Sequence, residues 1–129
     1  MTDAEYRREK ARVEKLLKAW TYDLGLRWWK LKFHYFREPL PPYEGEGSSA
    51  DAAMDCRADW RYTRAGIRVN LLATKELSDD DLEWAVVHEC MHVFLHEMRE
   101  GGLEHEERVA STLASAFLWA RDAAKGVKG

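Results

Sequence analysis

Cysteine is scarce in this sequence, and long apolar runs are missing. Cys56 and Cys90 fall in a predicted strand and in the middle of a predicted apolar helix, so we expect no disulfide between them and expect Cys90 to be a small core residue. No stretch approaches the roughly 18 apolar residues that a membrane span needs. The first residues are polar and acidic, unlike a secretory signal. We therefore expect a cytoplasmic protein with no membrane partner.

Neither sign of charge is in marked excess, with 20 Lys and Arg against 23 Asp and Glu and a net charge of -3. This balance gives no electrostatic reason to expect nucleic acid as a partner. The basic residues of segment 7–18 alternate with glutamates, which indicates a solvated helix face. A hydrophobic fraction of 46% over 129 residues is typical of one globular domain.

Periodicity divides the chain into helices and strands. Apolar residues recur at helical spacing over 3–24, 79–99 and 103–124, and alternate with polar ones over 29–35, 52–60 and 66–72. Gly25 is expected to end the first helix, and Ser78 before three aspartates to begin the second. Prolines and glycines make 38–50 a loop. The predicted fold is α+β: an N-terminal helix, a small three-stranded sheet with an antiparallel hairpin, then two helices.

The pentad His88-Glu89-Cys90-Met91-His92 carries the chemistry. On a helix, histidines four residues apart differ by about 40° in direction and about 6 Å along the axis, so both can reach one metal ion. Glu89 lies on the same side of the helix, near the open coordination position. This pattern is typical of a zinc hydrolase, in which a carboxylate deprotonates the water that the metal polarises.

The residues around the pentad support this interpretation. Much of the helix surface is apolar, with a stripe at helical spacing formed by Trp84, Val87, Met91, Phe94 or Leu95, and Met98. A helix apolar on most of its circumference is buried. Histidines and a glutamate in its middle would be costly to desolvate without a partner. A metal ion would be that partner.

A third protein ligand is expected downstream, where the chain reads Leu103-Glu104-His105-Glu106-Glu107. About 13 Å of helix separate His92 from the glycines at 101 and 102. If the last helix folds back, Glu107 reaches furthest toward the histidines and Glu104 least. Glu106 and Glu107 differ by about 100° in direction, so we expect only one to face the ion, and both remain open on helical phase. Exposed carboxylates at a helix start, here Glu104 and Glu106 if Glu107 is the ligand, are expected to matter little for zinc.

The order of pentad, glycine loop and Glu107-Arg108-Val109-Ala110 resembles the gluzincin metallopeptidases, in which a glutamate in an E-x-x-A setting is the third zinc ligand. Within that group it is similar to minimal gluzincins and to small HExxH proteins of phages and mobile elements, including repressor-cleaving peptidases. The resemblance covers about residues 50–118. It implies that residues 1–129 form a single zinc metallopeptidase-like domain and that Zn2+ is held by His88, His92 and Glu107.

The expected function is zinc-dependent hydrolysis of peptide bonds in a protein or peptide substrate, with Glu89 as the general base. The hairpin edge, at the 66–72 strand, would bind the substrate as an added strand. One alternative is a non-catalytic zinc domain that binds a partner protein. Another is a SprT-like zinc protein with His105 as the third ligand.

The residue that would stabilise the oxyanion stays open among Tyr62, Arg64, His96 and His105. We expect His96 to have a structural role rather than to be a ligand. His34 is expected to face solvent. The tryptophans are expected to form core and cleft walls rather than a platform for stacking.

Overall fold

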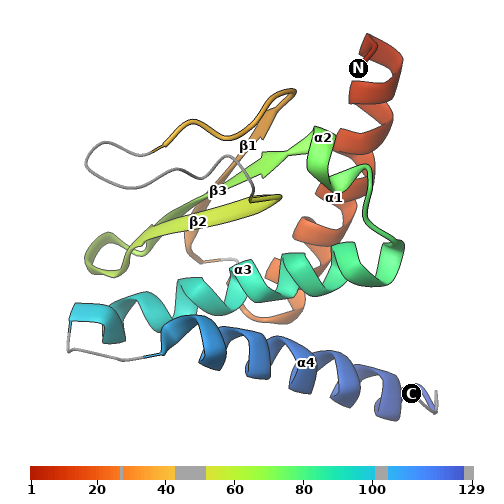
Figure 1. Ribbon diagram of the computed structural model, residues 1–129. Helices are drawn as coiled ribbons and strands as arrows, with labels where there is room; N and C mark the ends of the chain where they lie inside the picture. The colour runs from red at the N-terminus through yellow and green to blue at the C-terminus, as the bar shows by residue number, and fades with distance from the viewer. Residues whose placement is uncertain (27, 43–51, 101–104, 127–129) are drawn as a thin grey trace.

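The computed structural model describes residues 1–26, 28–42, 52–100 and 105–126, and its elements confirm the α+β class (Figure 1). The predicted 38–50 loop lies largely outside these ranges, as do Gly101, Gly102 and Glu104. The elements are α1 (Asp3–Asp23), β1 (Lys30–Phe36), β2 (Met54–Asp59), the short turn η1 (Trp60–Tyr62), β3 (Arg64–Asn70), α2 (Leu71–Thr74), α3 (Asp79–Glu100) and α4 (Glu106–Ala124).

The three strands form one mixed sheet in the order β1-β3-β2. Strand β3 is central, parallel to β1 and antiparallel to β2, so the predicted hairpin is confirmed. Helices α1 and α3 lie on the same side of the sheet, and α4 packs on α3 away from it (Figure 1). The apolar side chains of the strands therefore face α1 and α3, and the opposite sheet face carries the polar residues of the alternation. His34 is exposed on that face, as predicted.

The predicted strand at 66–72 is two residues too late. Thr63 adopts a left-handed conformation with φ 48° and closes the turn after η1, so β3 begins at Arg64. The side chain of Asn70 accepts hydrogen bonds from the backbone N–H groups of Leu72 and Ala73 and thereby caps α2, which the sequence analysis did not predict. Because β3 is paired on both sides, it has no free edge for a substrate. Within the part of the chain that the structure describes, the free edge on the α3 side belongs to β2.

The two long C-terminal helices, α3 and α4, pack against each other. Ser78 Oγ accepts a hydrogen bond from the Asp81 N–H at 3.1 Å, which confirms the predicted start of α3. In α4 the fully buried residues are Ala110 and Ala114, whereas the large side chain of Phe117 is 42% exposed. Small side chains let α4 approach α3 closely, so the large apolar residues of α4 lie at the margins of this contact.

Cys90 is buried in the core as predicted, and both described cysteines are unpaired thiols. Burial raises the pKa of the Cys90 thiol to about 12. Trp20 is buried and Trp84 is half-buried, in line with the prediction for the tryptophans, but Trp28 and Trp119 are largely exposed. Within the described ranges no helix combines the length and apolarity needed to cross a membrane.

The sequence pattern indicated that the charges of the first helix are solvated, and for Glu9 this is wrong. Its carboxylate is buried, and it accepts hydrogen bonds from Arg12 Nη1 at 2.9 Å and from Thr74 Oγ1 at 2.8 Å. The same guanidinium donates to the carbonyl oxygens of Thr74 and Leu77. This network joins α1 to α2 and to the segment that leads into α3.

Glu9→Ala is therefore expected to lower the free energy of unfolding by about 2–3 kcal/mol, because it leaves a hydroxyl and a charged group of the network without their partner. Urea denaturation measures this change. The exposed Glu76→Ala is the matched control, and its effect should stay within about 0.5 kcal/mol. Equal stabilities for the two variants would show that the network does not hold these elements together.

Candidate metal centre

Three potential metal ligands meet where α3 and α4 run side by side. His88 and His92 lie one turn apart on α3, and Glu107 is the second residue of α4. Each offers a ligand atom, and these atoms all lie within 4.8 Å of one another. Glu107 Oε2 is 3.1 Å from His88 Nε2, and Glu107 Oε1 is 2.9 Å from His92 Nε2. The fold therefore brings together the three residues named in the sequence analysis.

The His88 ring is held in place but incompletely partnered. It stacks on Trp84 with ring centroids 5.0 Å apart and planes 10° apart, and the Trp84 indole N–H donates to Ser115 Oγ of α4. Its Nε2 is buried and makes no hydrogen bond within the described part of the chain, despite its proximity to Glu107. A buried nitrogen without a partner is costly, and a metal ion would satisfy it.

Glu106 fixes the orientation of the second imidazole. Its Oε2 is 2.6 Å from His92 Nδ1, which leaves Nε2 of the same ring to face Glu107. The Glu106 side chain is 10% exposed and that of Glu107 is 76% exposed. Histidines that bind metals commonly donate their other N–H to a carboxylate in this way.

Of the two glutamates only Glu107 joins the ligand cluster of the described residues, as expected, but the expectation that Glu106 is an exposed carboxylate of little importance is wrong. Both carboxylates are used, because a single imidazole presents nitrogens on two sides. Two adjacent glutamates at the start of a helix that packs against histidines are the signal that could have identified Glu106.

Glu89 has the environment of a proton acceptor. Its carboxylate is buried, Oε1 lies 3.6 Å from His88 Nδ1, and Oε2 has no hydrogen-bond partner among the described residues. Burial raises the pKa of Glu89, and the neighbouring His88 and His92 counteract this only in part. Burial also lowers the pKa of His88, but Glu89 and Glu107 outweigh it and leave that pKa raised.

A hollow of about 400 Å³ opens in front of these groups, large enough for a few residues of an extended chain. One wall is α3, with His88, Glu89 and His92, and the other is the segment that leads into and forms the start of β2. The lining residues are Ala52, Ala53, Met54, Asp55, Cys56, Ala85, His88, Glu89, His92 and Glu107. The site thus lies directly beside the free edge of the sheet.

The remaining sequence candidates lie elsewhere. His105 is exposed at the N-cap of α4, with φ 63°, and is not part of the ligand cluster found in the described ranges. Tyr62, Arg64 and His96 do not line the hollow; Arg64 and His96 line a second one on the sheet. Glu104 lies outside the described residues.

Comparisons of the chain with protein-family models, with curated proteins and with solved structures return no match. The capacity of the site is therefore judged from its own donors. Two imidazoles and one carboxylate are the ligand set of many catalytic zinc sites, which leave a fourth position open. In a tetrahedral site, bonds of about 2.0–2.2 Å place ligand atoms about 3.3–3.6 Å apart. The ligand atoms all lie within 4.8 Å of one another, so small side-chain movements would close them around such an ion, which would also satisfy the buried nitrogen of His88.

Proposed function

We propose that this protein is a zinc-dependent peptidase whose metal is held by His88, His92 and Glu107. The observation that carries the proposal is the position of Glu89. A buried carboxylate with a raised pKa and an oxygen without a partner stands beside the ligand cluster and faces the same hollow. A purely structural zinc site has no use for such a group, whereas hydrolysis requires a base there.

The chemistry divides between the ion and the protein. When bound, zinc would supply the Lewis acidity that polarises a carbonyl and eases ionisation of water near neutral pH. Glu89 accepts the proton of the attacking water and delivers it to the leaving amine, and its raised pKa brings it closer to the working pH of such a base. Glu106 holds the His92 ring in the orientation that directs Nε2 into the site.

The substrate that fits this site is an extended segment of protein. A peptide that pairs with the free edge of β2 would place its backbone along the hollow, with main-chain hydrogen bonds providing affinity whatever its sequence. The small side chains of Ala52 and Ala53 line this approach. The likeness of the chain to minimal gluzincins and to the small HExxH proteins of phages supports the same activity.

The test combines metal content with proteolysis. Protein isolated with zinc in the medium is expected to hold about one zinc per chain, to cleave members of a proteome-derived peptide library, and to lose cleavage on chelation and regain it with zinc. His88→Ala and His92→Ala should abolish both zinc content and cleavage, while His34→Ala, an exposed histidine on β1, should change neither. Mass spectrometry of the metal and of the new peptide termini measures both quantities.

Two results would contradict the proposal. Zinc content that survives both histidine substitutions would place the metal elsewhere. Stoichiometric zinc without any cleavage by the intact protein would favour the non-catalytic zinc domain.

A further inference from the structure

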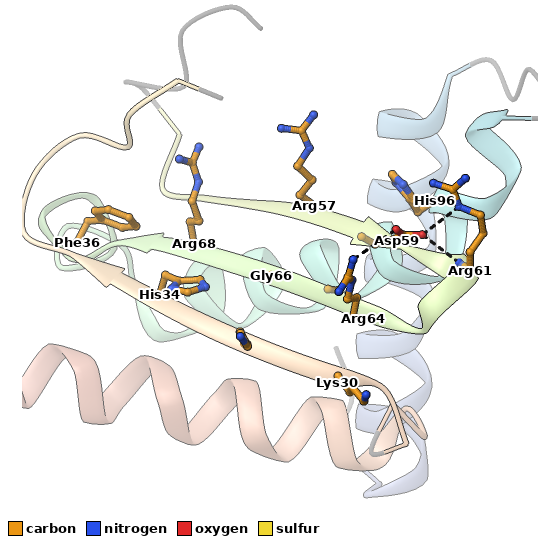
Figure 2. Close-up of a pocket in the computed structure, with 13 residues that line it drawn as sticks. Lys30, His34, Phe36, Arg57, Asp59, Arg61, Arg64, Gly66, Arg68 and His96 are labelled. Atoms are coloured by element: carbon orange, nitrogen blue, oxygen red, sulfur yellow. Dashed lines mark hydrogen bonds and ion pairs between the residues drawn. The ribbon is translucent and has the colours of Figure 1, made fainter. Parts of the chain in front are cut away.

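Cationic side chains gather on the sheet face that no helix covers, as Figure 2 shows. The strand register produces this gathering. Lys30 pairs with Arg64, Gly66 with Arg57, and His34 with Arg68, and these positions are two or four residues apart along each strand, so they share one face of the sheet. We call this surface the basic face. Its residues are Lys30, Lys32, His34, Phe36, Arg57, Asp59, Arg61, Arg64, Gly66, Arg68 and His96.

The charge of the basic face is opposite to that of the whole chain. Among the described residues the face carries six Lys and Arg side chains and Asp59, which lies near Arg61 and Arg64, and Arg68 is paired with Asp55. Lysine and arginine side chains thus predominate around one hollow of about 740 Å³, in a protein whose net charge is -3. Gly66 lies at the middle of the central strand, and because it has no side chain the hollow is open there. Charge of one sign around a concave surface concentrates counter-ions of the other.

Two exposed aromatic side chains lie at one end of the sheet. Trp28 is 68% exposed and Tyr62 is 63% exposed, and each precedes a strand by two residues. Because β1 and β3 are parallel and Lys30 pairs with Arg64, both aromatics lie at the same end of the sheet. The Arg64 guanidinium also stacks over the Tyr62 ring, 5.1 Å from its centroid. Large exposed aromatics beside cations suit a partner that has both negative charge and flat rings.

We propose that the basic face binds single-stranded nucleic acid, with its phosphates along Lys30 and Lys32 and its bases against Trp28 and Tyr62. A positive groove flanked by aromatic side chains is the arrangement by which proteins hold single strands without sequence preference. An acidic peptide would use the cations but not the rings, and a rigid duplex would leave its bases inaccessible to them. The net charge of the chain gave no reason to expect this partner, because the cations are distributed over three strands in the sequence.

This inference is independent of the proposed peptidase activity. The basic face and the metal centre have different lining residues, and none of the candidate zinc ligands lines the basic face. Zinc content and peptide cleavage of each variant can therefore be measured on the same preparations that are used for binding.

Fluorescence anisotropy of a labelled oligothymidine in low salt is the experiment. The intact protein is expected to bind it in the micromolar range, with an affinity that falls as salt rises. Lys30→Glu/Lys32→Glu should weaken binding by about tenfold or more and reduce the salt dependence, since fewer phosphates are neutralised. Arg7→Glu/Arg8→Glu, the same charge change on exposed positions of α1, should have little effect.

Trp28→Ala and Tyr62→Ala should each weaken binding by about fivefold or more.

Thermal melting shows whether the charge reversal disturbs folding. If it does, the milder variant Lys30→Gln/Lys32→Gln, which only removes the two charges, replaces it in the binding measurement. Each of several results would overturn the proposal. The first is the absence of binding at about 100 µM protein, the weakest end of the usual non-specific range. The others are equal effects of the α1 and β1 charge reversals, and unchanged binding in both aromatic variants. Equally effective competition by poly-glutamate would assign the face to an acidic peptide instead, and tighter binding of duplex DNA would exclude the single-strand assignment.

Discussion

Glu89→Gln is expected to lower peptide cleavage by about 100-fold or more while zinc content stays at the level of the unaltered protein. Glutamine keeps the shape of the side chain but cannot accept the proton of the attacking water. The free energy of unfolding should not fall, because the replaced carboxylate is buried without a full set of partners and a neutral amide costs less to bury. Initial rates on one cleaved peptide from the library measure the effect.

Glu38→Gln, the same change at an exposed position, is the control for Glu89→Gln and should retain full activity. A Glu89→Gln protein that cleaves its substrate at the normal rate would show that another group takes the proton. A loss of zinc together with activity would instead make Glu89 part of the metal site.

Glu107→Ala is expected to reduce zinc affinity more than any other substitution in α4, because it leaves two imidazoles with an incomplete shell. Glu106→Ala should weaken zinc binding by about 10–100-fold, since it removes only the group that orients His92. His105→Ala, at an exposed position, should leave zinc affinity unchanged. Competition with a chromogenic chelator gives the three affinities.

The order of these three effects decides between the proposed ligand sets. A larger loss from His105→Ala than from Glu107→Ala would transfer the third ligand to His105, as in the SprT-like alternative. A larger loss from Glu106→Ala than from Glu107→Ala would exchange the roles of the two glutamates.

The parts of the molecule that were predictable are those that depend on residues near in sequence. Helical spacing was enough to place His88, Glu89 and His92 on one side of α3, and the hydroxyl of Ser78 marked where that helix begins. Glu107 was harder, because helical phase left Glu106 equally open, and only its longer reach and the resemblance to a family favoured Glu107. The structure places both near His92, in different positions.

The features that were missed depend on contacts between distant segments. The sequence pattern placed Asn70 in a strand, but in the structure its side chain caps α2, where the chain turns toward α3. Glu9 looked like one solvated charge among many, but its partner Thr74 lies far along the chain. The basic face could not be inferred from charge counts, because it exists only when the three strands are in register.

The course of α4 gives the candidate site a second role. This helix is joined to α3 at its far end by the ion pair of Arg121 with Glu83, at 2.7 Å, and at its near end by Glu107 between the two histidines. A shared ion would therefore act as a cross-link that closes a short loop between the helices. For a disulfide that closes a loop of about 15 residues, the lost chain entropy corresponds to about 3 kcal/mol. The described cysteines of this chain are unpaired, so a bound ion would supply the loop-closing stabilisation that a disulfide supplies in other proteins.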